Sequence, residues 1–377
     1  MNATPVLCIV GTSTVKLFGL SGEERLRRLF ARAGIKSVIT VAELAKQNST
    51  IILARADASL DPPLIQAIVQ QPGLVLTTEH GTPLIGHVTT DKAAQLLEVL
   101  QNSEAKLASQ FNYRAPSKLD ANFWKSLRKR ETPYALLTTK LSQASDEWRM
   151  FMGTYKGATD LVTKHLWPRP AFLATRFLAP LGVTPNMVTT VAAIMTVLAF
   201  YHFWRGEFVI GLIAAWAMTF LDTVDGKLAR TTLTSSKWGD VFDHGIDLVH
   251  PPFWYWAWGL GLAKWGISWG NELFFWVIAV IMAGYVLQRV MEGISIKWLG
   301  LEIHIWRPID TFFRQITARR NPNLILLTIG TIIQRPDWGL IAVAAWTGIC
   351  LVVHGLQLLQ AFAAKSKAPL QSWMSAK

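Results

Sequence analysis

Several features are scarce in this 377-residue chain, and each scarcity excludes a class of protein. It has only two cysteines, Cys8 and Cys350, so it can form neither a disulfide framework nor a cysteine-based metal knuckle. The N-terminus lacks a basic segment followed by a long apolar run, so we expect no signal peptide. These scarcities exclude a secreted disulfide scaffold and a zinc finger, and the 51% apolar content excludes a collagen-like or disordered chain.

Tryptophan is absent from the first 123 residues, because all 17 tryptophans lie at or after Trp124. The balance of basic and acidic residues changes at a similar place in the sequence. Residues 1–110 hold 10 Lys/Arg against 9 Asp/Glu, whereas residues 111–377 hold 27 against 16 and carry most of the net charge of +12. This shift predicts two domains, and the uncompensated basic charge suits phosphate-bearing ligands or an anionic membrane face.

Residues 1–110 lack any apolar run of the roughly 18 residues that a membrane span needs, which predicts a soluble domain. Short apolar runs at 5–10, 37–41, 51–54 and 74–77 alternate with helical patterns at 22–33, 42–48, 62–70 and 90–101. Strands that alternate with helices predict an α/β layer fold with a parallel sheet.

This arrangement resembles the nucleotidyltransferase-like domains that make NDP-sugars and CDP-alcohols. The resemblance is carried by PVLCIVG (5–11), GLSGEERLRRLFARAGI (19–35), ILARADASLDPPLI (52–65) and HGTPLIGHV (80–88). It implies a metal-binding acid at Asp57, where a loop-forming or capping Asp is the alternative. The family's triphosphate loop has an Arg and a Pro-Lys, but this chain offers only Gly11 to Lys16. We therefore expect a degenerate domain without nucleotidyl transfer activity, which docks on the membrane domain.

Beyond residue 183, apolar stretches of membrane-spanning length recur, at about 184–204, 208–229, 239–262, 272–292, 309–334 and 338–362. They predict an all-α domain of six transmembrane helices over 184–364, followed by a tail at 365–377. Lys and Arg concentrate in the segments after the second and fourth stretches, which places both termini in the cytoplasm. Residues 111–150 are predicted as a linker. Residues 151–183 are predicted as an amphipathic helix in the headgroup plane, with a plain linker as the alternative.

Acidic residues fall in register on the second and third of these stretches. Asp222 and Asp225 lie three apart, while Asp243 and Asp247 lie four apart, so each pair shares one helix face. Four unpaired carboxylates near a bilayer boundary would cost on the order of 10 kcal/mol, at about 3 kcal/mol each. Two divalent cations would balance that charge and suit oxygen ligands. Taken singly, such acids would be interpreted as helix caps.

The full pattern, D-x2-D-G-x2-A-R-x8-G-x3-D-x3-D, resembles the signature of the CDP-alcohol phosphotransferases, and the resemblance extends over roughly 155–362. Its positions are filled by Asp222, Asp225, Gly226, Ala229, Arg230, Gly239, Asp243 and Asp247. Two further stretches, KGATDLVTKHLWPRPAFLATRFLAPLGVTPNMVTT (156–190) and RRNPNLILL (319–327), look most like the branch that joins inositol phosphates through CDP-inositol and often carries an N-terminal cytidylyltransferase.

This resemblance implies roles for the residues of the motif. The four acids would hold two Mg²⁺ or Mn²⁺ ions, and Asp247 would accept the proton of the attacking hydroxyl. Gly226, Ala229, Arg230 and Gly239 would contact the CDP-alcohol, together with Asn186 and Thr189. Arg289, Arg319 and Arg320 are candidates for binding the acceptor phosphate, with positive-inside anchors as the alternative.

The predicted function is therefore phosphotransfer from a CDP-alcohol, of CDP-diacylglycerol or CDP-inositol type, to the hydroxyl of a second alcohol with release of CMP. The second alcohol would be inositol-phosphate-like or a lipid. We expect a multi-pass protein of the cytoplasmic membrane that functions in phospholipid synthesis without a nucleic-acid partner. The resemblance implies a homodimer. A bifunctional enzyme that makes its own CDP-alcohol is one alternative. A cation-coupled transporter is another, although it would spread its acids over several helices.

Overall fold

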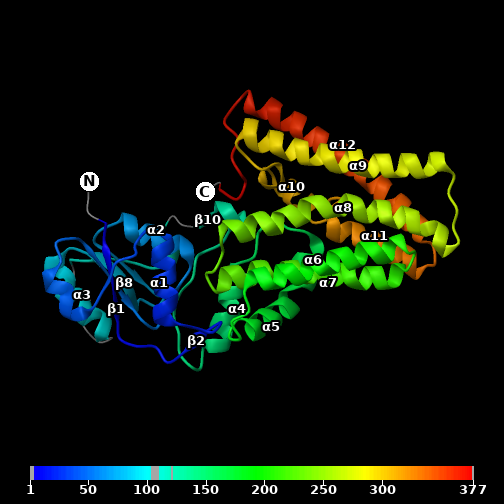
Figure 1. Ribbon diagram of the computed structural model, residues 1–377. Helices are drawn as coiled ribbons and strands as arrows, with labels where there is room; N and C mark the ends of the chain where they lie inside the picture. The colour runs from blue at the N-terminus through cyan, green and yellow to red at the C-terminus, as the bar shows by residue number, and fades with distance from the viewer. Residues whose placement is uncertain (1–3, 103–109, 120–121, 376–377) are drawn as a thin grey trace. The chain divides into compact units, whose positions relative to one another are not determined.

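The computed structural model describes residues 4–102, 110–119 and 122–375, except for the side chains of residues 243 and 244 (Figure 1). The chain forms two compact units. The first comprises Met1–Tyr155, Thr175–Gly182 and Lys227–Thr234, and the second comprises Lys156–Ala174, Val183–Gly226 and Ser235–Lys377.

The first unit is built on a six-stranded sheet in the order β4-β1-β5-β8-β7-β9. The strands are β1 (Val6–Val10), β4 (Val38–Ile39), β5 (Ile51–Arg55), β7 (Leu74–Thr77), β8 (Pro83–Val88) and β9 (Asn112–Arg114). Side chains alternate along β1, so that Leu7 belongs to one core cluster while Val6, Cys8 and Val10 belong to another. The sheet is therefore buried on both faces.

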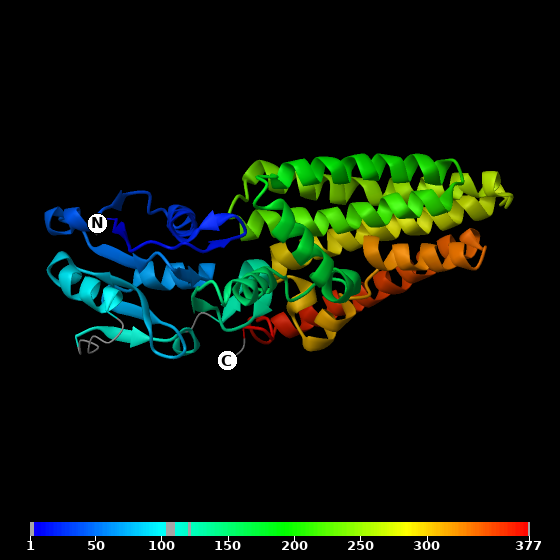
Figure 2. The same cartoon turned by 90° about the horizontal axis from the view of Figure 1, so that it is seen from below.

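Helices cover those two faces. α1 (Gly22–Arg32) and α2 (Pro62–Gln70) contribute to the core on the Leu7 face, and α3 (Thr90–Gln101) contributes to the core on the other. Figure 2 shows the sheet between the blue α1 and the cyan α3. Residues 4–102 also contain a short 3-10 helix at Val41–Lys46 and a ribbon of β2 (Lys16–Leu17) paired with β3 (Leu20–Ser21). The predicted α/β layering is confirmed.

The prediction of a parallel sheet was wrong, because the sheet is mixed. β1 pairs in parallel with β4 and β5, but β8 runs antiparallel to both β5 and β7. Only a short turn joins β7 to β8, with Thr78 N donating to Thr82 O at 2.8 Å and Gly81 at φ +90°. A connection this short can join only antiparallel strands, since a parallel pair needs a crossover of a dozen or more residues.

Residues 111–150, predicted as a linker, contain regular structure within the first unit. β9 extends the main sheet, β10 (Phe123–Trp124) pairs with β11 (Lys129–Arg130), and β12 (Ala135–Leu137) pairs with β6 (Ala58–Leu60). α4 (Gln143–Gly153) follows, and the unit extends to Tyr155. These strands are two or three residues long, too short to give a recognisable period-2 pattern in the sequence.

The second unit is helical. Its helices are α6 (Pro185–Trp204), α7 (Phe208–Thr231), α8 (Lys237–Trp265), α9 (Asn271–Ile294), α10 (Pro308–Phe313), α11 (Arg320–Ile332) and α12 (Pro336–Lys365). Ahead of them lie a π-helical turn at Val162–Leu166 and α5 (Pro168–Leu178), so the predicted amphipathic segment 151–183 is not one helix. α9 and α12 lie side by side (Figure 1).

Four helical segments among the described residues are long and apolar enough to span a bilayer: Pro185–Trp204, Phe208–Thr231, Asn271–Leu299 and Pro336–Lys365. The chain is therefore an integral membrane protein. α8 has sufficient length, but it carries Asp240, two internal prolines and several tryptophans, which lower its hydropathy. Six spans therefore remain a prediction.

The fifth predicted span, 309–334, is two helices rather than one. α10 ends at Phe313 and α11 begins only at Arg320. Pro322 explains the break, because proline has no N–H and fits a helix only within its first turn. α11 accordingly starts two residues before Pro322.

Aromatic side chains fill the core of the second unit between α6, α7 and α8. Trp258 stacks on Phe208 with ring centroids 4.2 Å apart, and its indole N–H donates to Pro336 O at 3.0 Å. A Cβ at Gly261 would lie 1.9 Å from the carbonyl oxygen of Phe203, so only glycine permits this approach of α8 to α6. These contacts hold the acid-bearing α8 against α6.

The first unit contains a buried acid that generates a pH prediction. Asp61 is 5% exposed and precedes α2, but Pro62 and Pro63 offer it no N–H, and it makes no side-chain cap bond in the described structure. Burial raises the pKa of Asp61 from 3.8 to about 7, although Lys129 opposes this shift. A raised carboxyl pKa stabilises the fold below the unfolded value, and the stabilisation is lost as the pH rises toward 7.

We predict that the free energy of unfolding of the first unit falls by about 4 kcal/mol between pH 4 and pH 7 through this group, then levels off. Asp61→Asn should flatten that slope. Hydrogen exchange of β5 amides, corrected for intrinsic rates at each pH, measures it. An unchanged slope in the variant would contradict the assignment.

Candidate active site

The acids of the predicted motif lie on two neighbouring elements of the second unit. Asp222 and Asp225 lie near the end of α7, and Asp247 lies in the first half of α8. The side chain of Asp243 lies outside the described part of the structure. Asp222 and Asp247 are brought together through one arginine.

That arginine is Arg320, the first residue of α11. Its Nη2 donates to Asp222 Oδ2 at 2.5 Å, and its Nη1 donates to Asp247 Oδ1. The side chains of Arg320 and Asp222 are only 14% and 18% exposed, so their ion pair is shielded from water, whereas Asp247 is 39% exposed. Arg320 thus joins α7, α8 and α11 through its two-pronged guanidinium. The sequence suggested Arg320 as an acceptor-phosphate ligand, whereas in the structure it neutralises acids of the motif.

Asp225 is held differently. It is 3% exposed, and its Oδ2 accepts a 2.5 Å hydrogen bond from Thr189 Oγ1 on α6. Its Oδ1 is buried without a hydrogen-bond partner among the described residues. A buried carboxylate oxygen left in this state is costly unless a cation or donor satisfies it.

The donor set fits a divalent cation, because Asp222, Asp225 and Asp247 offer the oxygen ligands that hard cations prefer. Within the described side chains, no cluster of three or more His, Cys, Asp or Glu residues already has metal-binding geometry. The orphaned Oδ1 of Asp225 is thus the observation that supports a cation here.

Residues predicted to contact the CDP-alcohol fall into two groups. Thr189 donates a hydrogen bond to Asp225, as described above. Asn186 lies beside Gly239, because a Cβ added to Gly239 would be 2.9 Å from Asn186 Oδ1. Gly239 therefore permits α8 to begin against the first turn of α6. Gly226 follows Asp225 on α7, whereas Ala229 and Arg230 lie in the last turns of α7 and belong to the first unit.

A second polar cluster surrounds Glu292 near the end of α9. Arg289 donates to Glu292 Oε1 at 2.9 Å, and Arg319 pairs with the same oxygen. His304 Nε2 lies 3.0 Å from that oxygen, and burial lowers the pKa of His304 to about 3, so it is neutral and donates an N–H. Two arginines against one glutamate leave a net positive charge, which favours an anion.

Sequence reasoning identified Arg289 and Arg319 but missed Glu292 and His304. The spacing of Arg289 and Glu292, three apart on one helix, is a signal that could have revealed the ion pair. His304 lies in a short 3-10 segment, Ile303–Ile305, so its contact with Glu292 depends on tertiary structure.

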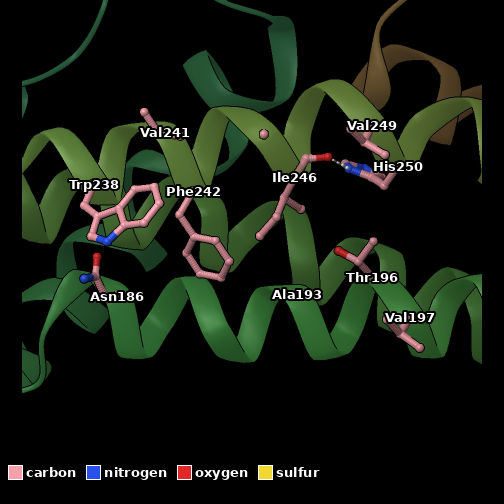
Figure 3. Close-up of a pocket in the computed structure, with 11 residues that line it drawn as sticks. Asn186, Ala193, Thr196, Val197, Trp238, Val241, Phe242, Ile246, Val249 and His250 are labelled. Atoms are coloured by element: carbon pink, nitrogen blue, oxygen red, sulfur yellow. Dashed lines mark hydrogen bonds between the residues drawn. The ribbon is translucent and has the colours of Figure 1, made fainter.

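A cavity of about 760 Å³ lies between α6 and α8. Its lining is largely apolar and comprises Asn186, Ala193, Thr196, Val197, Trp238, Val241, Phe242, Gly245, Ile246, Val249 and His250. Figure 3 shows Asn186 and Trp238 at one end of the labelled group and His250, Thr196 and Val197 at the other. The polar Asn186 end is also the Gly239 contact, so the cavity begins where the CDP-alcohol is predicted to bind.

The shared guanidinium generates a stability prediction. Arg320→Met should leave Asp222 and Asp247 without their ion pair and destabilise the second unit by about 3–5 kcal/mol. Adding Asp222→Asn and Asp247→Asn to that variant should recover part of the loss, because the unpaired charges are removed. Thermal unfolding in detergent measures both. Arg205→Met, at a side chain that is 51% exposed, is the matched control and should change stability little. Equal losses in Arg320→Met and the triple variant would contradict the assigned ion pairs.

Comparison with known proteins shows what this region is similar to. Residues 182–320 match the family model described as CDP-alcohol phosphatidyltransferase. Archaetidylinositol phosphate synthase of Pyrococcus horikoshii is 29% identical over 174 residues, which cover 45% of this chain and 81% of that protein. Phosphatidylinositol phosphate synthase of Streptomyces avermitilis is 39% identical over 97 residues, 25% of this chain and 37% of that protein. Cholinephosphotransferase 1 of Danio rerio is 33% identical over 90 residues, 22% of each chain.

The matched range contains both acid-bearing elements, from the start of α6 to Arg320. The chain spans less than half of the Streptomyces and Danio proteins, so the similarity to them is confined to this domain. Residues 182–320 are therefore similar to the CDP-alcohol phosphatidyltransferase family, and the relatives are named as synthases of inositol phosphate lipids and as a cholinephosphotransferase.

Proposed function

We propose that this protein transfers a lipid-bearing phosphoryl group from a CDP-linked lipid to a hydroxyl of an inositol-phosphate-like acceptor. The hydroxyl oxygen forms a bond to the phosphorus that carries the lipid. The bond from that phosphorus to the CMP oxygen breaks, and CMP leaves. The carboxylate cluster at Asp222, Asp225 and Asp247 is the observation on which this proposal rests.

Each acid has its own part in this reaction. Of the two acids bound to Arg320, Asp247 is the more accessible, because its side chain is 39% exposed and that of Asp222 is 18% exposed. Asp247 therefore accepts the proton of the attacking hydroxyl. Asp222, Asp225 and Asp243 would hold two Mg²⁺ or Mn²⁺ ions together with Asp247. When bound, such ions neutralise charge on the pyrophosphate. The hydrogen bond from Thr189 fixes the orientation of the Asp225 carboxylate, and therefore also the position of its other oxygen, Oδ1.

The cavity between α6 and α8 supports a lipid donor over CDP-inositol. It begins at Asn186, a predicted CDP-alcohol contact, and is lined mainly by apolar side chains. Its volume of about 760 Å³ is within the range of small-molecule pockets. Trp238 and His250 are twelve residues apart on α8, about 18 Å at 1.5 Å per residue. An alkyl chain fits an apolar cavity of that length, whereas inositol would leave its hydroxyls unpaired there.

The charge around Glu292 supports an acceptor with a phosphate. Arg289 and Arg319 are both half-buried, and a phosphate can accept hydrogen bonds from two such guanidiniums. Two relatives are named as synthases of inositol phosphate lipids, which favours inositol phosphate as the acceptor.

Other features of the proposal concern placement. The six apolar stretches of the sequence favour six spans, and the Lys/Arg distribution favours both termini in the cytoplasm. A homodimer is expected from the family. The first unit is proposed to lack nucleotidyl transfer activity. Its candidate acid, Asp57, is held by a two-bond ion pair with Arg55 at 2.9 and 3.0 Å, which occupies the oxygens that a metal would need.

The proposal is tested by product analysis. Purified protein with Mg²⁺ and inositol phosphate is supplied with CDP-diacylglycerol or CDP-inositol, and products are identified by mass spectrometry. We predict a phosphatidylinositol phosphate and stoichiometric CMP only from the CDP-lipid. Product from CDP-inositol alone would contradict the donor assignment, and absence of CMP with every donor would contradict the reaction.

A substitution in the cavity between α6 and α8 tests whether this cavity holds the lipid chain of the donor. Ala193→Phe narrows the cavity and should raise the KM for a long-chain CDP-lipid about tenfold, while a short-chain analogue is affected less. Ala283→Phe, on the exposed side of α9, adds the same side chain outside the cavity and serves as the control. Equal KM values for the two variants would show that the cavity does not hold the lipid chain.

A further inference from the structure

The end of α7 is built into the first unit. α7 runs from Phe208 to Thr231, and the residues from Lys227 onward, with the turn up to Thr234, cluster with the first unit. Asp225, whose carboxylate is part of the candidate site, lies only two residues before Lys227. The same helix therefore carries acids of the site and ends among residues of the N-terminal unit.

Two arginines of α1 satisfy the last carbonyls of this helix. Arg25 donates to Thr231 O at 2.9 Å, and Arg28 donates to Thr232 O at 2.8 Å. The same Nη2 of Arg25 also donates to Leu17 O at 3.2 Å. The last carbonyls of a helix have no partner within the helix, and the helix dipole favours cations at this end. Arg25 is 4% exposed, so its charge is committed to this position.

The turn after α7 is anchored as well. Thr234 N donates to Ala229 O at 2.9 Å, which closes the helix around Leu233 at φ +57°. Glycine usually takes such a left-handed position, because a side chain there is strained. Leu233 is tolerated because its side chain is 8% exposed and belongs to the core formed by α1, α2 and the sheet. Burial of Leu233 therefore fixes where the helix ends.

A third contact holds the helix just before its end. Lys227 lies over the Tyr155 ring, with Nζ 2.9 Å from the ring centroid, and is 3% exposed. Together with Arg25 and Leu233, this contact restrains both the rotation and the axial position of the last two turns of α7.

We propose that the first unit serves as a positioning domain for α7, with Arg25 and Arg28 as positioning residues for Asp222 and Asp225. This inference rests on the proposed function of the carboxylate cluster. It gives the first unit a role that does not depend on nucleotide binding: the unit fixes the end of α7, and the register of a continuous helix fixes the acids one to three turns before it.

The test uses the full-length protein in detergent with three variants of α1. Arg25→Gln and Arg28→Gln each remove a donor to α7, while Arg27→Gln removes an exposed arginine of the same helix and is the matched control. Two readouts are followed: hydrogen exchange of the amides at 227–232, and CMP release at varied Mg²⁺. Arg28 is only half-buried, so Arg28→Gln remains informative if Arg25→Gln fails to fold.

We expect exchange at 227–232 to rise in both variants but not in Arg27→Gln. We expect kcat to fall about three- to thirtyfold and the Mg²⁺ requirement to rise, with substrate KM nearly unchanged. Faster exchange with normal kcat and Mg²⁺ dependence would overturn the proposal, as would unchanged exchange. A wild-type protein that releases no CMP would instead refute the proposed function, while the exchange result would still report on the contacts.

Discussion

The candidate site depends on one constraint: carboxylates on apolar helices must be neutralised. Arg320 meets this requirement for Asp222 and Asp247, which lie on different helices, by pairing with both at once. Its guanidinium can do so because the chain breaks after α10 and restarts at Arg320, so the arginine sits at the beginning of α11. Pro322 makes that break necessary, and the polar centre of the second unit depends on it.

Asp225 is the member of the cluster that no described protein group fully satisfies. Its hydrogen bond to Thr189 ties α6 to α7, and its second oxygen remains available for a cation. α6 packs closely against α8 at Gly261 and at Gly239, and the cavity lies between these two helices. The apolar chain of the donor would thus lie near Ile246, and the donor pyrophosphate near Asp225. The phosphate of the acceptor would lie near Arg319.

The sequence could predict the parts of this site that follow from local spacing. Helical periodicity placed Asp222 with Asp225 on one element and Asp247 on the next, and the structure has them on α7 and α8. Arg320 could not be assigned in this way, because it is 73 residues from Asp247 and its contact arises from tertiary packing. The parallel sheet was mispredicted for a related reason: the orientation of β8 depends on the short turn at Thr78 and Gly81, while strand and helix alternation alone favoured crossovers.

The most direct test of the account is CMP formation by Asp247→Asn compared with Asp240→Asn. Both acids lie on α8, but Asp240 is an exposed residue of its first turn, whereas Asp247 pairs with Arg320. With CDP-diacylglycerol, inositol phosphate and Mg²⁺, the account predicts that Asp247→Asn lowers kcat about 100-fold or more, as loss of a general base does, while Asp240→Asn changes it little. Equal kcat values for the two folded variants would contradict the role of the carboxylate cluster.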